Sequence, residues 1–484
     1  MKKVVLTFVT LLMSLLANGQ EPVEIDGLKY DLNVEEKTAS VSSNNHYYGV
    51  LVIPETVNYQ NVDYTVTGIS ENAFNWTELL SVKIPNSVKV IDSGAFSYNS
   101  NLASVVIGDG VETIKAGAFR SCANMISIVL GNKVSTIGQN AFYGNSNLNQ
   151  VYINDLKKWC QIDFGSLEAN PLYYAHHLYL NKKEVKELVI PEDITTIKDY
   201  AFAGGSSIKS LTMGDNISSI GAYSFYQCSS LASLELASSI TSIKACAFYE
   251  CTDLEELQLP DGIESISGSC FYGCSKLEKL KLPSNLQIIK DYAFWGCSKL
   301  RSVTIPASVE FIYGYAFSFT SSESVNFFVN PEYPPLAYGY SFPEGSKIYV
   351  PDGSIEPYQN VEPWSSFDIH TFSESGPEKC GTPVVSYKNG VLSFSSETPD
   401  AEFHYAITSA DGQKNVGNSL DISGNCVVSV YASKKGYEDS ETVTSEINII
   451  GKQGDVNRDG EVNVADHVEL TEIIMGQANA GDNE

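Results

Sequence analysis

Apolar residues recur along the middle of the chain in units of 23 residues. One unit, residues 254–276, reads LEELQLPDGIESISGSCFYGCSK. Its first six residues alternate between apolar and polar, which predicts a strand whose leucines face a core while Glu256 and Gln258 face outwards. Pro260 follows, and it ends the strand because proline cannot donate a hydrogen bond to a neighbouring strand.

The phenylalanine of this unit marks the repeat. It returns at steps of 22, 23 or 25 residues, apart from one step of 60, at Phe74, Phe96, Phe119, Phe142, Phe202, Phe225, Phe248, Phe271, Phe294, Phe317 and Phe342. A single unit cannot bury its own apolar side chains, so the units gain stability only by stacking. Because leucine-rich repeats have periods of 20 to 29 residues, we predict an α/β leucine-rich-repeat solenoid, rich in strands, with short helices or 3-10 turns. Within the 60-residue step, NDLKKWCQIDF (residues 154–164) predicts a short helix with Asp155 near its start and Trp159 as a packing residue.

A second column of residues lies three positions after each phenylalanine, and small polar residues and cysteine alternate in it. Its members are Thr77, Asn99, Cys122, Asn145, Gly205, Cys228, Cys251, Cys274, Cys297 and Thr320. We expect these side chains to tie a turn inside the stack. Stacked units point their side chains in parallel, which leaves the Cβ atoms too far apart for good disulfide geometry, so we predict buried free thiols.

Residues Gly68 to Phe342 resemble the BspA-like leucine-rich-repeat family of bacterial surface proteins, whose units read like LxxLxLPxxIxxIxxxAFxxC. The opening EIDGLKYDLNVEEKTASV, the tract DLKKWCQIDF…ANPLYYAHHLYLN and the closing KIYVPDGSIEPYQNVEPW are also similar to this family. The resemblance implies a solenoid over residues 20–373, with a cap at 21–67, repeats at about 68–342 and a second cap at 343–373. It also implies adhesion to host proteins, other cells or glycans.

The N-terminal residues 1–19 have the pattern of a secretory signal peptide. Two lysines precede an apolar run from Val4 to Leu16, and the small residues Ala17 and Gly19 mark a cleavage region. No other stretch approaches the ~20 apolar residues that a membrane span needs. We therefore expect a secreted or cell-surface protein.

Residues 374–450 follow a polar linker and contain short alternating segments with turns between them. Lys388-Asn389-Gly390 predicts a hairpin, and the spacing of the segments predicts a β-sandwich. The region resembles immunoglobulin-like or chitobiase C-terminal-like modules of bacterial surface proteins. Pairing between Cys380 and Cys426 stays open.

The tail, residues 451–484, contains a spacing that suits Ca²⁺. Oxygen ligands stand at loop positions 1, 3, 5, 7, 9 and 12, namely Asp455, Asn457, Asp459, Glu461 through its carbonyl, Asn463 and Asp466, with Gly460 at position 6. A short helix is expected to follow this EF-hand-like loop. Aspartate at position 12 resembles a type I dockerin, which implies a cohesin-like partner. A complete dockerin has two such loops, whereas this tail has one.

Charge and motif content narrow the function classes. The chain carries a net charge of −27, and loss of Lys2 and Lys3 with the leader makes it −29, so a nucleic-acid partner is excluded by repulsion from phosphate. No phosphate loop, dinucleotide fingerprint or zinc spacing is present. Cys160 with His176 or His177 is the best nucleophile and base combination, and we interpret all three as structural residues. We predict no catalytic activity.

Aromatic residues follow the repeat phenylalanine in successive units and form a candidate ligand surface. They are Tyr226, Tyr249, Tyr272 and Trp295. Exposed aromatics in a row are suited to sugar rings or a partner protein, and the alternative is that they pack between units. Two functions follow: a binding or adhesion protein that uses its repeats, or a dockerin-bearing accessory subunit of a polysaccharide-degrading assembly.

Overall fold

The structure is a computed structural model that describes residues 21–44, 46–318, 324–375, 380–388, 391–399, 401–409, 414–415, 426–434 and 440–447. It contains two compact units, one ending at Phe372 and one beginning at Ser373. The predicted signal peptide lies outside the described residues. Among the residues that are described, no helix has the length and apolar character needed to cross a membrane.

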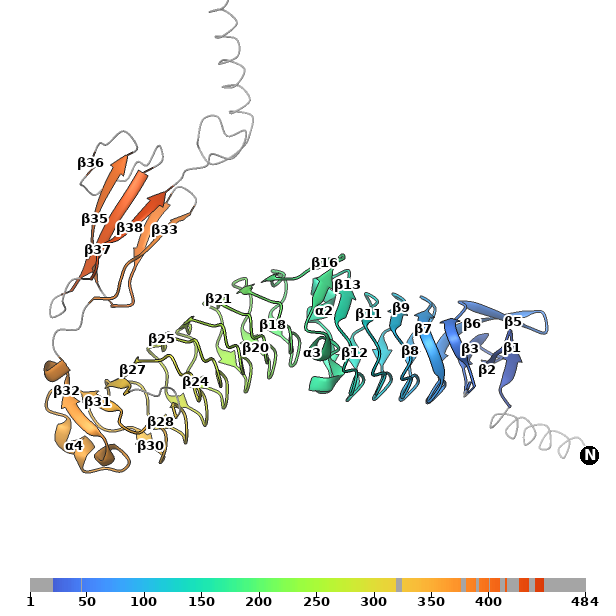
Figure 1. Cartoon of the computed structure of the whole chain (residues 1–484), viewed down its shortest axis with the longest axis horizontal. Coiled ribbons are helices and arrows are strands. Elements are labelled where there is room, and N and C mark those ends of the chain that lie inside the picture. Colours follow the sequence, from blue (N-terminus) through green and yellow to red (C-terminus); the bar gives the residue numbers. More distant parts are fainter. Residues whose placement is uncertain are drawn as a thin grey trace, which may run out of the picture. The chain divides into compact units, whose positions relative to one another are not determined.

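The first unit is an elongated, curved stack of coils, each of which gives one strand to each of two mainly parallel sheets (Figure 1). The first seven-stranded sheet contains, in spatial order, β16 (Lys183–Glu184), β15 (Leu178–Leu180), β13 (Gln150–Ile153), β11 (Ser127–Val129), β9 (Ser104–Ile107), β7 (Glu78–Ile84) and β4 (Tyr48–Val52). The nine-stranded sheet contains β1 (Val23–Ile25), β2 (Leu28–Asn33), β3 (Thr38–Val41), β6 (Val62–Ile69), β8 (Val90–Ile91), β10 (Thr113–Ile114), β12 (Thr136–Ile137) and β14 (Asp163–Phe164), with β5 (Thr56–Tyr59) paired to β6.

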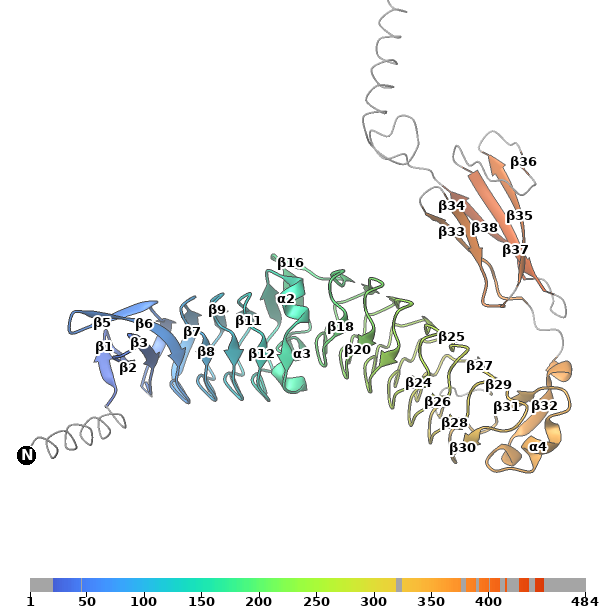
Figure 2. The same ribbon diagram turned by 180° about the vertical axis from the view of Figure 1, so that it is seen from behind.

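Both sheets stop and start again at the 60-residue step (Figure 2). The side with the longer strands continues as β17 (Glu187–Val189), β19 (Ser210–Thr212) and β21 (Ser233–Glu235), then β23 (Glu256–Gln258) and β25 (Lys279–Lys281), then β27 (Ser302–Ile305), β29 (Asn326–Val329), β31 (Lys347–Val350) and β32 (Asp368–Thr371). The other side continues as β18 (Thr196–Ile197), β20 (Ser219–Ile220) and β22 (Ser242–Ile243), then β24 (Ser265–Ile266), β26 (Ile288–Ile289), β28 (Phe311–Ile312) and β30 (Leu336–Ala337).

Short helices occupy the interruption, and the first of them is the one that the sequence predicted. The helix α2 (Leu156–Cys160) is capped by Asp155, whose carboxylate accepts a hydrogen bond from the Lys158 backbone N–H at 3.1 Å. The 3-10 helix η1 (Leu167–Ala169) and the helix α3 (Leu172–Ala175) follow. Side chains continue the stack where strand pairing ends, since the Trp159 indole donates to the Ala201 carbonyl at 3.0 Å and Asn170 donates to the Tyr200 carbonyl at 2.7 Å.

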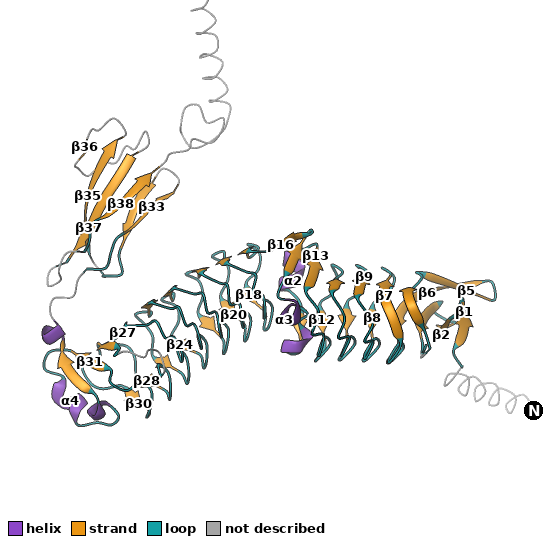
Figure 3. Cartoon of the chain, in the orientation of Figure 1, coloured by secondary structure: helices purple, strands orange, loops and turns teal. Residues whose placement is uncertain are grey.

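Strands and tight turns dominate each coil, and helices are few and short (Figure 3). The expected strand-rich solenoid is therefore confirmed. The remaining helices lie at the C-terminal end of the stack, in α4 (Ile355–Gln359), η2 (Trp364–Ser366) and η3 (Phe372–Ser375). There the buried Tyr358 and Trp364 side chains donate to the carbonyls of Pro331 at 2.8 Å and Pro335 at 2.9 Å, which covers the end of the core.

The core is built on the repeat phenylalanines. From Phe74 to Phe142 and from Phe202 to Phe317 they are fully buried, and neighbouring rings stack with centroids 5.2–5.5 Å apart and planes within 8°. Phe342 continues this column at 6.0 Å from Phe317. This series is called the inner phenylalanine ladder below.

The column three residues after each phenylalanine ties successive coils together. The Asn99 amide donates to the carbonyls of Phe74 at 2.7 Å and Phe96 at 2.9 Å. Where cysteine stands in this column, its thiol donates to the phenylalanine carbonyl of the previous coil, as from Cys251 to Phe225 at 3.3 Å. The thiols at positions 122, 228, 251, 274 and 297 are buried and free, which confirms the prediction for these positions. Thr320 lies outside the described residues.

The second unit consists of antiparallel strands. One sheet pairs β33 (Val384–Lys388) with β34 (Val391–Ser395), and Lys388 lies opposite Val391, which confirms the predicted hairpin. The other sheet contains, in spatial order, β36 (Lys414–Asn415), β35 (Glu402–Ser409), β37 (Cys426–Ser433) and β38 (Val443–Ile447). Two antiparallel sheets are compatible with the β-sandwich, which stays a prediction. Cys380 is buried, whereas the Cys426 side chain lies outside the described residues.

Candidate ligand-binding surface

The four aromatic residues singled out in the sequence stand in one continuous stack on the surface of the repeats. Tyr226 and Tyr249 have ring centroids 4.9 Å apart, Tyr249 and Tyr272 are 4.4 Å apart, and Tyr272 and Trp295 are 4.4 Å apart. The planes lie within 18° of one another, and each side chain is half-buried. We call this series the outer aromatic ladder. It lies in the turns that follow the second strand of each coil.

Stacking determines which parts of these aromatic rings a ligand can contact. Both faces of Tyr249 and of Tyr272 are covered by neighbouring rings, so the ring edges and hydroxyl groups are what solvent can reach. Burial, together with the neighbouring Tyr272 and Glu250, raises the pKa of Tyr249, so its hydroxyl stays protonated at physiological pH and can donate a hydrogen bond. Sugar rings generally stack on open aromatic faces, so these inner members suit edge contacts with a protein better than sugar stacking.

A second column lies two residues before each phenylalanine, and tyrosine stands in it at positions 200, 223, 292, 315 and 340. Tyr292 stacks on Tyr315 at 5.1 Å, and Tyr315 stacks on Tyr340 at 5.6 Å. Every described member of this column has a positive φ, between 54° and 65°, including Tyr200 and Tyr223. Residues with a Cβ generally avoid this left-handed region at a cost of about 1–2 kcal/mol, so the turn between coils imposes this conformation and stacking offsets part of its cost.

The outward face of the first seven-stranded sheet carries a further series that sequence reasoning missed. Pairing in register places Val106, Val129, Tyr152 and Tyr179 side by side on four adjacent strands. Val106 is 40% exposed, and the rings of Tyr152 and Tyr179 stack at 4.9 Å. We call these four residues the apolar row. The signal was present in the sequence, in the second outward position of SVVI, SIV and QVYI.

After the 60-residue step the corresponding positions begin with the exposed Val189 and then turn polar or charged over five coils, at Thr212, Glu235, Gln258, Lys281 and Thr304. The row ends in the stacked rings of Phe328 and Tyr349. The neighbouring row of serines continues in both halves, with Ser81 opposite Ser104 and Ser210 opposite Ser233. In the same row Glu256 and Lys279 form an ion pair at 2.5 Å. The hydrophilic stretch of this face therefore runs from Thr212 to Thr304, between apolar or aromatic residues on both sides.

The candidate nucleophile and bases have separate structural partners. Cys160 is buried, and burial raises the pKa of its thiol from 9.0 to about 12, so it is protonated at neutral pH. The His176 imidazole lies 2.8 Å from the Gly204 carbonyl, and the His177 imidazole lies 2.6 Å from the Glu184 carboxylate. Nothing in this arrangement activates the thiol as a nucleophile.

The predicted calcium ligands lie outside the described residues, so the calcium loop stays a prediction. These ligands are Asp455, Asn457, Asp459, Glu461, Asn463 and Asp466. Within the described part of the chain, no group of three or more histidine, cysteine or acidic side chains is placed to hold a metal ion.

Comparisons with known proteins concern the repeats. The model of the BspA type leucine-rich repeat region matches six copies, over residues 62–168, 175–269 and 218–333, which together make up more than half of the chain. A solved leucine-rich repeat protein from Bacteroides ovatus is 24% identical, with 72% of this chain and 99% of that chain covered and a TM-score of 0.39. A leucine-rich cell surface protein from Faecalibacterium prausnitzii is 19% identical, with 68% and 96% covered and a TM-score of 0.31. The pneumococcal vaccine antigen PcpA is 18% identical, with 72% and 98% covered and a TM-score of 0.37. No curated protein matches the chain.

Proposed function

The chain belongs to the BspA-type leucine-rich repeat family, and we propose that it is a non-catalytic binding protein whose repeats hold a protein partner on a host or neighbouring cell. The observation that carries this proposal is the apolar row, Val106, Val129, Tyr152 and Tyr179, whose side chains are aligned across four strands. Val106 is exposed and the other three are half-buried. Exposed apolar side chains in a continuous patch are a common mark of protein interfaces.

Rigidity supports a binding role over a catalytic one. Each outward side chain is fixed in register with those of the neighbouring coils, so a partner meets a preformed surface and loses little affinity to ordering of the protein. Between Thr212 and Thr304 the same face is hydrophilic, and there Glu256 pairs with Lys279.

The first test compares partner binding by three variants. The row variant, Val106→Ser with Tyr152→Ser, should lose binding to a protein partner by at least about tenfold, because loss of about 1.4 kcal/mol of contact energy corresponds to that factor. The matched control carries Gln258→Ser and Thr304→Ser at equivalent positions of the second half and should bind normally. Binding is measured by probing arrays of matrix proteins and glycans and then by titrating the captured partner.

A third variant, Tyr249→Ser with Tyr272→Ser and Trp295→Ser, tests the outer aromatic ladder. We expect it to keep partner binding, because stacking already occupies the inner ring faces. If this variant lost binding while its circular dichroism spectrum stayed unchanged, the binding site would be the outer aromatic ladder and not the apolar row. Loss of the folded spectrum would show that the ladder packs the coils together.

The tail favours a second candidate function. The six oxygen ligands between Asp455 and Asp466 have the spacing of a single calcium loop with dockerin-like aspartate at position 12. Such a tail would attach the protein to a cohesin-like module, as an accessory subunit of a polysaccharide-degrading assembly. Together with the leader at residues 1–19, it supports a secreted or cell-surface location.

Calorimetry of the full chain tests the calcium loop. We expect saturable Ca²⁺ binding that Asp459→Ala or Asp466→Ala weakens by at least about 100-fold, because each change removes a charged ligand from a six-ligand site. Asp482→Ala removes the same charge outside the loop and should leave binding unchanged. Absence of heat at millimolar Ca²⁺ would contradict the site. A pull-down with a cohesin then decides between a calcium-ordered tail and a docking module.

A further inference from the structure

A further column of the repeats lies two residues after each phenylalanine. From Trp76 to Gly296, every member of this column has a positive φ, between 55° and 80°. Glycine tolerates this left-handed conformation and stands there in four coils, at Gly144, Gly204, Gly273 and Gly296. The first two coils have Trp76 and Tyr98 instead, with φ values of 57° and 61°. A residue with a Cβ is disfavoured in this conformation, so burial or function must offset the cost.

Burial does not offset this cost at Trp76. The indole stacks on the Tyr98 ring, with centroids 4.5 Å apart and planes within 2°. One face of the indole is therefore covered, yet the residue is still 71% exposed, so the other face is open to solvent. The Trp76 N–H donates to the Ser97 carbonyl at 3.1 Å, which holds the residue in register with the next coil. Trp76 is thus a fixed aromatic platform with one open face.

The open face of Trp76 is turned towards the N-terminal end of the stack. The next coil supplies Tyr98, which covers the opposite face. The segment that leads into β4 lies on the N-terminal side, because the Asn44 N–H donates to the Ala73 carbonyl at 2.7 Å and the Glu78 N–H donates to the Tyr47 carbonyl at 3.2 Å. These two contacts flank Trp76 in the sequence, so this segment and the open ring face lie at the same end of the stack.

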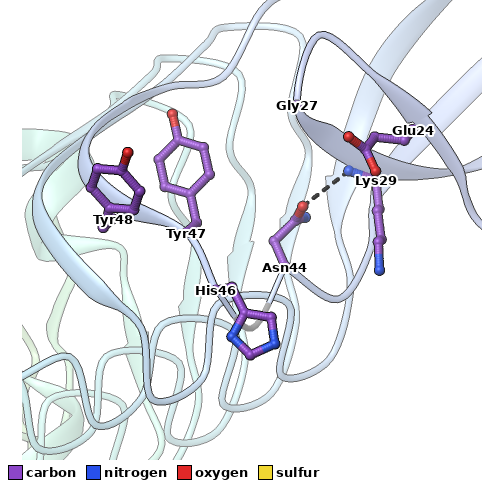
Figure 4. A pocket seen from close by; sticks show the side chains of 7 residues that line it. All are labelled: Glu24, Gly27, Lys29, Asn44, His46, Tyr47 and Tyr48. Carbon is purple, nitrogen blue, oxygen red and sulfur yellow. Dashed lines mark hydrogen bonds between the residues drawn. The ribbon is translucent and has the colours of Figure 1, made fainter.

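A hollow of about 600 Å³ lies beside the same segment (Figure 4). Tyr47 and Tyr48 lie on one side of it, and Glu24 and Lys29 of the β1–β2 hairpin lie on the other. His46 also lines it. The volume falls within the range of about 300–1,000 Å³ that is usual for small-ligand sites. The lining combines aromatic rings with hydrogen-bonding groups of both charges.

We propose that Trp76 and this hollow bind an uncharged oligosaccharide, with one sugar ring on the open indole face and the neighbouring sugar units in the hollow. A pyranose presents C–H groups on its flat faces and hydroxyl groups around its edge. The indole face matches the C–H groups. Glu24 accepts hydrogen bonds from hydroxyl groups and Lys29 donates hydrogen bonds to them, so the hollow can satisfy a sugar edge in both directions.

Charge favours an uncharged sugar over other ligands with flat rings. The chain carries a net charge of −27, which repels nucleotides and acidic glycans. Glu24 and Lys29 carry opposite charges, so together they offer no net charge to an ion. This site goes beyond the proposed function, because it lies at the end of the stack and includes no member of the apolar row.

Titration of the full chain with soluble oligosaccharides of glucose, N-acetylglucosamine, mannose and xylose tests the site. Trp76 is exposed, whereas Trp159 and Trp364 are buried. A bound sugar should therefore protect the fluorescence of Trp76 from quenching by acrylamide. Trp76→Gly should remove this protected signal and lower the affinity at least about tenfold. The variant should keep its fold, because glycine suits the φ of this position.

Tyr340→Gly is the matched control. Tyr340 has a φ of 65°, is 74% exposed and stacks on Tyr315, but it belongs to the C-terminal coils. This variant should bind the oligosaccharide normally. The row variant, Val106→Ser with Tyr152→Ser, should also bind it normally, which separates this site from the proposed function. Equal losses in Trp76→Gly and Tyr340→Gly, or no protection of Trp76 by any of the four kinds of oligosaccharide at millimolar concentration, would overturn the proposal.

A double variant, Glu24→Ala with Lys29→Ala, tests the hollow without changing the net charge. It should weaken oligosaccharide binding at least about tenfold, because hydrogen bonds to charged groups are the stronger ones. Normal binding by this variant would contradict a role for the hollow. A peptide array probed with the full chain examines the alternative occupant of the indole face. Capture of peptides that depends on Trp76, without binding of any oligosaccharide, would show a protein ligand and would refute the sugar site.

Discussion

Replacing Phe248 by alanine should lower the free energy of unfolding of the repeat stack by about 3–5 kcal/mol. The side chain is fully buried, and its ring lies between those of Phe225, at 5.2 Å, and Phe271, at 5.4 Å. The substitution removes apolar area and leaves a cavity that the two adjacent coils can close only by moving together. It also removes two stacked aromatic contacts, each of which is worth about 0.5–1.5 kcal/mol.

Denaturant unfolding followed by circular dichroism measures this loss. Phe248→Leu keeps most of the volume and should cost less than half as much. Tyr292→Ala removes an aromatic ring that is 40% exposed and should cost about 1 kcal/mol. If Phe248→Ala were no more harmful than Tyr292→Ala, the inner phenylalanine ladder would not be the core that holds the coils together.

The coils could be predicted from the sequence because every coil must bury the same apolar positions. Phe248 and its equivalents must be buried in every coil, so they recur at one spacing, and the alternating residues before Pro260 must put leucine inwards. The Asn and Cys column could be predicted as well, since Asn99 and Cys251 both donate to carbonyls that the turns leave open. Each of these positions has the same role in every coil, so the repeat period alone reveals it.

The turns between coils were not predicted. Tyr200 and Tyr223 have φ values of 65° and 55°, a conformation that tyrosine rarely adopts. The signal for it lies only in the glycine and asparagine at equivalent positions of earlier coils, such as Gly94 and Asn140. The neighbouring coil imposes it, because the Phe202 N–H must reach the Ser224 carbonyl at 2.7 Å to keep the stack in register. The break of both sheets at the 60-residue step was not predicted either, and there the Asn170 side chain donates to the Tyr200 and Ala201 carbonyls of the next coil.

The candidate surface was predicted only in part. The sequence analysis singled out Tyr249 and Tyr272 because aromatic residues follow the repeat phenylalanine, and in the structure their rings stack. The apolar row was missed because valine at positions 106 and 129 looks like core material in a single unit. Only the register between strands shows that these side chains point away from the core and line up with Tyr152.

Ionisation of five buried thiols alone should lower the free energy of unfolding of the stack by on the order of 5–7 kcal/mol when the pH is raised from 8 to 10. Five thiols line the Asn and Cys column, at Cys122, Cys228, Cys251, Cys274 and Cys297. Burial raises the pKa of Cys122, Cys228 and Cys274 from 9.0 to about 12, and the pKa of the other two is raised well above 9.0 by the same cause. An ionised thiol would also lose its bond to a phenylalanine carbonyl, as at Cys251.

The sign of this pH effect follows from comparing the ionisation of the thiols in the folded chain and in the unfolded chain. Below pH 9 the thiols are protonated in both the folded and the unfolded chain, so their full contribution to stability is present. Between about pH 9 and 12 the unfolded chain ionises while the folded chain does not, and each thiol costs about 1.4 kcal/mol for each pH unit. Above the folded pKa of about 12 the loss levels off.

Unfolding by denaturant at pH 8, 9 and 10 measures this slope, and a matched variant separates the thiols from the other groups that titrate at high pH. Cys251→Asn replaces one thiol by the amide that occupies the same column at Asn99 and Asn145, so the coil keeps a donor. Its slope above pH 9 should be smaller by about 1.4 kcal/mol for each pH unit. An identical slope in the variant would contradict the prediction. It would mean that Cys251 ionises as readily in the folded stack, where it is fully buried, as in the unfolded chain.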